Sequence, residues 1–144
     1  MDDAVRLAIY RRFVADGAPP TVDDVATHLG AAPGDVEASY RRLADAHVIV
    51  LEPGSAEVWI APPLSARPTT FRVTAASGSW WGTCVWDALG VPAMLGEDAR
   101  IDTACADCGE PMDLVVRDGA LAPVAGVAHF AVPARAWWDD IGFT

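Results

Sequence analysis

A polar, proline-bearing segment divides this chain into two regions with different hydrophobic periodicity. The segment PPLSARPTT, residues 62–70, has the composition of a linker. Before it, apolar residues recur mostly at helical spacing, and after it short runs with strand character predominate. We therefore expect an α+β protein with a boundary near residue 65. Residues 1–64 would form a winged-helix-like N-terminal module, and residues 65–144 a small mixed β-sheet domain with short helices.

The N-terminal region has the pattern of three helices followed by a hairpin. Residues 3–16 are predicted to form the first helix. Thr21 is a good N-cap for a second helix over residues 22–30, and residues 36–48 show one apolar face of a third. Two strand-like runs then surround a turn at Gly54. This order is typical of a winged helix, a fold that often reads DNA.

The charge of the chain argues against nucleic acid as a partner. Its ten cationic side chains are all arginine against twenty carboxylates, which gives a net charge of -10. Residues 1–62 alone hold five arginines and ten carboxylates, a net charge of -5. The helix that would read bases opens with Gly34, Asp35 and Glu37, where basic or amide side chains are expected. A winged-helix transcriptional regulator stays an alternative that this charge disfavours.

The N-terminal segment, the lengths of the apolar runs and the number of cysteines lead us to expect a cytoplasmic protein without membrane contact. The N-terminal MDDAVRLAIYRRF lacks the apolar core of a signal peptide, and no apolar run approaches the length of a membrane span. Three cysteines are an odd set, which does not suggest a disulfide framework. They are expected to be core residues, metal ligands or nucleophiles.

The C-terminal region alternates strand-like runs with one short helix. We expect a helix at WDALGVPAMLG and a tryptophan-bearing tail after the last strand. The predicted strands are FRVTA, ARIDTAC, MDLVVRDG and GVAHFAV, of which the second and third are joined by a turn at residues 107–109.

Cys84 and Asp87 are the residues that best fit a chemical role. With Thr83 as N-cap, Cys84 would lie in the first helical turn, where backbone N–H groups lower a thiol pKa. Asp87 would lie on the same face, and nearby tryptophans would form an apolar pocket that raises its pKa. The thiolate would hold a soft electrophile while the carboxyl moves a proton. Alternatively, Cys84 is a small core residue and Asp87 faces solvent.

A longer stretch carries a family resemblance. The run WWGTCVWDALGVPAMLGEDARIDTACADCGEPMDL resembles the core of the organomercurial (alkylmercury) lyase family. In that family an aromatic-flanked CxxD precedes a helix with leucine and proline, then AR, a strand and a further cysteine. The helical module before residue 65 and the late VAHFAVPARAWWDD follow the same family order, and residues 71–115 are the most specific part.

The resemblance implies an enzyme that cleaves carbon–mercury bonds by protonolysis. Two cysteine thiolates hold the organomercurial, and an aspartate protonates the leaving carbon. Cys84 matches the first cysteine, Asp87 matches the aspartate, and Cys105 matches a cysteine regarded as structural. The implied partners are a small organometallic or other soft-electrophile substrate and the cytosolic thiols that remove inorganic mercury. No organic cofactor is required.

One departure from the family pattern bears on turnover. The second mercury-binding cysteine would fall at about Gly126, within PVAGVAHF, and no thiol is present there. A second soft ligand helps to weaken the carbon–metal bond, so its loss affects cleavage more than binding. A second hypothesis is therefore a non-catalytic metal-binding, organometal-binding or sensing protein on the same scaffold.

Cys105 and Cys108 form a CxxC followed by glycine, a tight turn that lets two sulfurs approach one metal. The candidate metal ligands are thus Cys84, Cys105 and Cys108, and the candidate ions are the soft or borderline Hg, Zn and Cu. Cys108 would either approach Cys84 as a replacement thiol or form an independent metal or redox pair with Cys105. Otherwise Cys105 is a buried strand cysteine and Cys108 a turn cysteine.

Trp81, Trp86 and His129 are the candidates for contact with the organic group of a substrate. Core and edge packing is the alternative for the tryptophans. A hydrogen-bonded core histidine is the alternative for His129, which lies between apolar neighbours.

Overall fold

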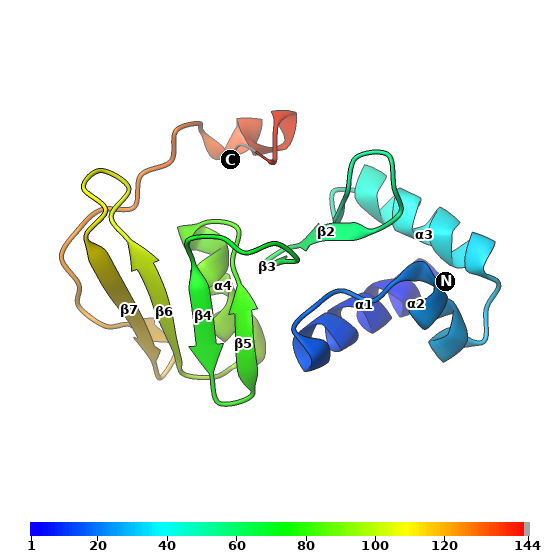
Figure 1. Ribbon diagram of the computed structural model, residues 1–144, viewed down its shortest axis with the longest axis horizontal. Helices are drawn as coiled ribbons and strands as arrows, with labels where there is room; N and C mark the ends of the chain where they lie inside the picture. Colours follow the sequence, from blue (N-terminus) through cyan, green and yellow to red (C-terminus); the bar gives the residue numbers. More distant parts are fainter. Residues whose placement is uncertain (143–144) are drawn as a thin grey trace.

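The structure, a computed structural model, describes residues 1–142. Figure 1 shows helices α1 to α3 at one end of an elongated molecule and the longer strands at the other. The helices are α1 (Asp2–Asp16), α2 (Val22–Leu29), α3 (Pro33–Asp45), α4 (Val85–Leu95) and the 3-10 helix η1 (Ala134–Asp139). The strands are β1 (Val50–Leu51), β2 (Val58–Ala61), β3 (Leu64–Ser65), β4 (Arg72–Ala75), β5 (Gly78–Trp81), β6 (Ala99–Ala104), β7 (Pro111–Arg117) and β8 (Ala120–Leu121).

The three N-terminal helices and the following hairpin occur where the sequence predicts them. Thr21 and Asp24 form a reciprocal capping box at the start of α2, and Gly30 ends that helix in the left-handed conformation. Asp2 at the start of α1 accepts hydrogen bonds from Arg42 at 2.6 and 2.9 Å and from Ser39, both on α3. This pairing holds the Asp2 pKa well below its usual range and ties α1 to α3.

All the strands join one antiparallel sheet of eight, in the order β1-β2-β3-β5-β4-β6-β7-β8. β3 pairs with β2 on one side and with β5 on the other, so the sheet continues from the N-terminal hairpin into the C-terminal strands. The expected boundary near residue 65 therefore falls within β3. The division into modules of residues 1–64 and 65–144 stays a prediction.

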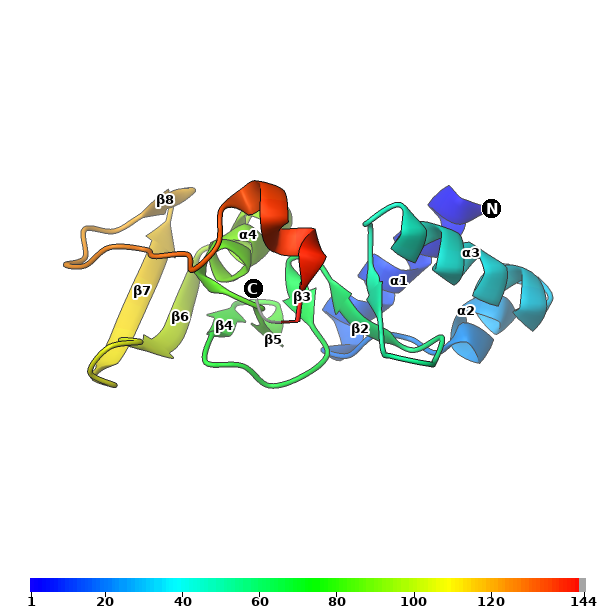
Figure 2. The ribbon, with the colours of Figure 1, turned by 90° about the horizontal axis from the view of Figure 1, so that it is seen from above.

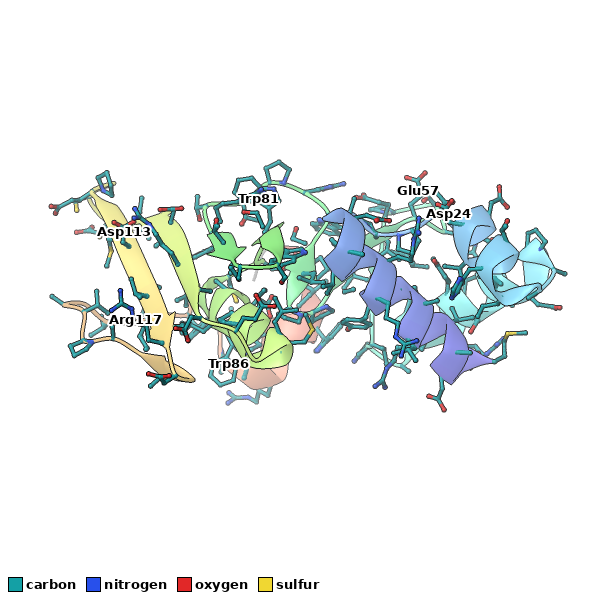
Figure 3. All side chains as sticks on the ribbon, turned by 90° about the horizontal axis from the view of Figure 1, so that it is seen from below. Asp24, Glu57, Trp81, Trp86, Asp113 and Arg117 are labelled. Atoms are coloured by element: carbon teal, nitrogen blue, oxygen red, sulfur yellow. The ribbon has the colours of Figure 1, made fainter. Side chains whose placement is uncertain are left out.

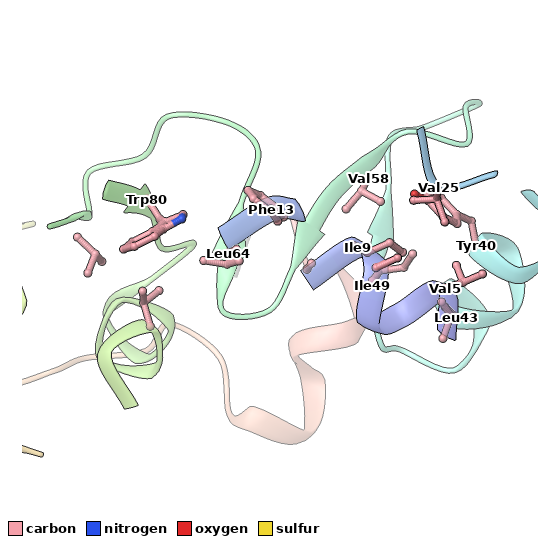
Figure 4. Close-up of a cluster of buried hydrophobic side chains, with 14 of the residues drawn as sticks. Val5, Ile9, Phe13, Val25, Tyr40, Leu43, Ile49, Val58, Leu64 and Trp80 are labelled. Atoms are coloured by element: carbon pink, nitrogen blue, oxygen red, sulfur yellow. The ribbon is translucent and has the colours of Figure 1, made fainter. Parts of the chain in front are cut away.

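A single hydrophobic cluster reaches from the helices to the strands, as Figure 4 shows. Phe13 of α1, Leu64 of β3 and Trp80 of β5 are all buried in it. The Trp80 indole Nε1 donates a hydrogen bond of 3.1 Å to the carbonyl oxygen of Val14. The polar group of this large core side chain is thereby satisfied, and β5 is fixed against α1.

The predicted helix at residues 86–96 and the first three predicted strands of the C-terminal region are confirmed. The prediction of a strand at GVAHFAV is wrong: residues 126–132 follow an irregular path from β8 to η1, seen in Figure 2 passing beside α4. The edge of β7 is occupied by β8, and Val127 is 93% exposed. An apolar run thus lacks both a strand partner and a core face here.

The tail returns toward the N-terminal region instead of ending beside the sheet. The Trp138 ring stacks on His47, which lies between α3 and β1, with ring centroids 4.2 Å apart and planes within 6°. Gly142 approaches the Trp59 ring of β2 so closely that a Cβ would lie 2.6 Å from it. The tail therefore lies against the N-terminal region at His47 and Trp59.

Within residues 1–142, no helix combines the length and the apolar character needed to span a membrane.

Candidate functional site

Cys84 lies at the start of α4, directly after the turn that leaves β5. It is the N-cap of the helix, with φ −143° and ψ −176°, whereas the sequence predicted Thr83 in that position. The turn needs glycine at residue 82, because a Cβ there would lie 2.7 Å from the backbone nitrogen of Ala88. The close approach of this turn to the second turn of α4 brings Cys84 and Asp87 into one compact segment.

The Cys84 thiol is half-buried, and burial raises its pKa. The nearby Asp87 charge acts in the same direction, and the backbone N–H groups of Asp87 and Trp86 only partly oppose both effects. In the described structure the Cys84 side chain accepts no capping hydrogen bond from the backbone of α4. The expected lowering of the thiol pKa by the helix N-terminus is therefore wrong, because desolvation exceeds it.

Asp87 is a half-buried carboxyl whose pKa is raised by burial, as predicted. The side chain and backbone N–H of Thr83 act against this rise. Among the described residues, the buried Thr83 Oγ1 has no hydrogen-bond partner of normal geometry. A protonatable carboxyl and the Thr83 hydroxyl thus adjoin the thiol at the start of α4.

The N-terminal region also reaches this site. The Asp87 charge contributes to a raised pKa of Tyr10 on α1, whose main cause is burial. Tyr10 Oη donates a hydrogen bond of 3.0 Å to the carbonyl oxygen of Pro62. Gly90 on α4 faces Pro63, whose Cβ would be 3.1 Å from an added Cβ. Sequence analysis missed Tyr10, because no local pattern connects residues so far apart in the chain.

Trp86 and His129 line the same surface hollow, of about 510 Å³. Phe130 and Trp137 complete its aromatic wall, and their rings meet at 5.3 Å between centroids. Trp86 is 66% exposed and belongs to the same helical turn as Cys84. Two of the three predicted contacts for an organic group therefore share one aromatic hollow, which Trp86 joins to α4 and which Cys84 and Asp87 do not line.

Trp81 lies apart from that hollow. Adjacent residues of a strand face opposite sides, so Trp80 enters the core and Trp81 points away from it. Arg72, its cross-strand partner, places its guanidinium 4.5 Å from the centroid of the Trp81 ring. Figure 3 shows Trp81 and Trp86 on opposite sides of the molecule.

Cys105 and Cys108 occupy the turn between β6 and β7. Cys105 follows β6 and is half-exposed, so it is neither in a strand nor buried, and Cys108 is exposed. Backbone N–H groups of Cys108 and Asp107, with the Cys108 thiol, lower the pKa of Cys105. β5 and β6 run in the same direction on either side of β4. Cys84 and Cys105 therefore both follow the carboxyl ends of strands, at the same end of the sheet.

No three-ligand metal group forms among the described residues, so Cys84, Cys105 and Cys108 do not meet as one set. Gly126, where the resemblance leads one to expect a second mercury-binding cysteine, lies over β7 with Met112 Cε 3.7 Å from the position of an added Cβ. The described structure therefore gives Cys84 no second thiol.

Comparisons with known proteins identify the family of this chain. The family model described as alkylmercury lyase, MerB, matches residues 64–144. The crystal structure of the mercury-bound form of MerB2 superposes with a TM-score of 0.66 and 26% sequence identity. That match covers 85% of this chain but 58% of the MerB2 chain, so this chain spans less than two thirds of its structural relative. No curated protein matches. On the extent of the family match, this chain belongs to the alkylmercury lyase family.

Proposed function

We propose that this protein is an organomercurial lyase that cleaves a carbon–mercury bond by protonolysis, with Cys84 as the mercury ligand and Asp87 as the proton donor. The observation that carries the proposal is the shared turn of a half-buried thiol and a half-buried carboxyl whose pKa is raised. Membership of the alkylmercury lyase family and likeness to a mercury-bound structure support it.

In the first step, Cys84 displaces a small thiolate from an organomercury thiolate. The Cys84 thiol loses its proton to the departing thiolate as the new sulfur–mercury bond forms. The raised pKa of Cys84 is compatible with this exchange, because the leaving group accepts the proton and no free thiolate has to accumulate.

In the second step, the protonated Asp87 donates its proton to the carbon bound to mercury. The electron pair of the carbon–mercury bond forms the new carbon–hydrogen bond, and the hydrocarbon leaves. Mercury stays bound to the Cys84 sulfur, and the ionised Asp87 carboxylate balances its positive charge. Burial of Asp87 favours the protonated form that this step requires. Cytosolic thiols would then remove the inorganic mercury and allow reprotonation.

The organic group would rest in the hollow lined by Trp86, His129 and Phe130. Its aromatic wall suits an apolar group, and its open side admits substrates of different size. We expect Trp86→Ala to raise KM for phenylmercury more than it lowers kcat, since Trp86 binds the part of the substrate that does not react.

The direct test is benzene release from phenylmercury in excess thiol. The wild-type protein should release benzene, Cys84→Ser should release none, and Asp87→Ala should be slower by about 100- to 10,000-fold, the usual contribution of a general acid. Asp45→Asn, which alters an exposed carboxylate at the end of α3, is the control and should retain the wild-type rate. Benzene release that survives in Cys84→Ser would refute the proposal.

A second candidate is a non-catalytic protein that binds mercury or an organomercurial. The observation in its favour is Gly126 in place of a thiol, because a missing second soft ligand affects cleavage more than binding. Stoichiometric phenylmercury binding that requires Cys84, without benzene release by the wild-type protein, would select this function.

The winged-helix-like character of residues 1–64 and a role in DNA binding remain predictions. The net charge of -5 over residues 1–62, from five arginines and ten carboxylates, opposes the second. A gel-shift titration at low salt should give no retardation.

A further inference from the structure

The turn between β6 and β7 carries two thiols that the proposed lyase reaction does not use. Cys108 is exposed and Cys105 is half-exposed, so both are accessible from solvent. The two cysteines lie three residues apart on one turn and are followed by Gly109, a spacing that lets two sulfurs approach one metal.

The backbone of this turn brings the sulfurs together. The Gly109 N–H donates to the Cys105 carbonyl oxygen at 2.8 Å, and the Cys105 N–H donates to the Glu110 carbonyl oxygen at 2.9 Å. Gly109 has φ +73°, a conformation that favours glycine.

We propose that Cys105 and Cys108 form a separate binding site for a soft metal ion that takes two thiolates in a linear arrangement, with Hg(II) as its probe. Zinc requires a tetrahedral set of four ligands. Within the described residues no third His, Cys, Asp or Glu completes such a set at this turn. Two thiolates alone suit soft ions of low coordination number, such as Hg(II) and Cu(I).

Binding is a thiol exchange without a change of oxidation state. Each cysteine thiol gives its proton to a small thiolate that leaves the metal, and each leaving thiolate is replaced by a cysteine sulfur. Two small thiols are therefore released for each Hg(II) ion bound. The second sulfur binds intramolecularly, so the pair should retain the ion against an excess of monothiol that would strip it from a single cysteine.

The test uses the full chain with Cys84→Ser, which removes the other thiol and separates this site from the proposed lyase activity. The protein is reduced, mixed with Hg(II) in excess glutathione, and examined by native mass spectrometry and sulfur-to-metal charge-transfer absorption. One Hg(II) ion should remain bound. Adding Cys108→Ser should weaken retention by on the order of a hundredfold.

Gly109→Val provides a second variant that keeps both thiols and strains the turn, since a β-branched residue resists this conformation. It should also weaken retention, and parallel titrations should show Cu(I) retained and Zn(II) lost to glutathione. Because Cys108 is exposed, its serine variant should melt at the temperature of its parent. Equal retention with and without Cys108, no retention in Cys84→Ser, or retention of Zn(II) equal to that of Hg(II) would each overturn the proposal.

Discussion

Cys84 and Cys105 both follow strands that terminate at the same end of the sheet, yet the surroundings of the two thiols shift their pKa values in opposite directions. At the start of α4, burial outweighs the backbone amides and raises the Cys84 pKa. At the turn after β6, the thiol is half-exposed and the amides with the Cys108 thiol lower the Cys105 pKa. Backbone N–H groups near a sulfur therefore do not fix its acidity, because desolvation decides which effect prevails.

The carboxyl beside each thiol extends the comparison. Asp87 is half-buried, and burial raises its pKa, which favours the protonated form next to Cys84. Asp107 and Glu110 beside the second turn are exposed. Under our two proposals, the first turn transfers a proton, whereas the second holds a metal by two sulfurs.

The largest expected effect comes from Cys84→Ser. This variant should abolish benzene release from phenylmercury while Hg(II) retention at Cys105 and Cys108 persists. The reason is that serine oxygen is a poor ligand for a soft metal. Gas chromatography of benzene and native mass spectrometry of the same sample measure both properties. Loss of both together would show that the turns act as one site.

Alanine at one glycine of each turn should have unequal effects. Gly82→Ala forces a Cβ to 2.7 Å from the Ala88 nitrogen, so we expect a loss of about 1–3 kcal/mol in unfolding free energy and a lower rate of benzene release. Gly109→Ala meets no atom within 4 Å but has φ +73°, which predicts a loss of about 1 kcal/mol. Urea unfolding measures both, and a more severe effect at Gly109 would contradict the comparison.

Alkylation should distinguish the thiols by their pH dependence. Because thiolate is the reactive form, modification of Cys105 should begin at lower pH than modification of Cys84. Iodoacetamide labelling followed by peptide mass spectrometry across a pH series gives a profile for each residue. Coincident profiles would argue against the opposing environments.

The smallest predicted effect concerns stability. Burial raises the pKa of Asp87 in the folded protein. The ionised carboxyl therefore lowers the free energy of unfolding, and this loss grows as the pH rises from the ordinary carboxyl pKa through the pKa in the folded protein. Asp87→Asn should therefore melt above the wild-type protein at pH 7, by on the order of a few degrees, and the difference should shrink in acid. Calorimetry at several pH values tests this, with Asp45→Asn as the matched control. A lower melting temperature for Asp87→Asn at pH 7 would be the contrary result.

Local signals in the sequence were enough to place the helices and to put Cys84 and Asp87 at the start of one of them. The N-cap at Thr21 and the spacing of Cys84 and Asp87 depend on neighbours in the chain, and Thr21 caps α2 as predicted. The strand predicted at residues 126–132 failed because apolar composition does not reveal whether a sheet edge is available. The proximity of Tyr10 to Asp87 depends on how residues far apart in the chain are brought together, which no local pattern encodes.

The separation of mercury binding from proton transfer is tested most directly with Asp87→Asn. Phenylmercury is added to this variant and to the wild-type protein at equal concentration, and bound mass and released benzene are followed together. The account predicts that Asp87→Asn accumulates a phenylmercury adduct on Cys84 and releases almost no benzene, while the wild-type protein releases benzene and retains only mercury. Benzene release by Asp87→Asn at the wild-type rate would contradict the assignment of Asp87 as the proton donor.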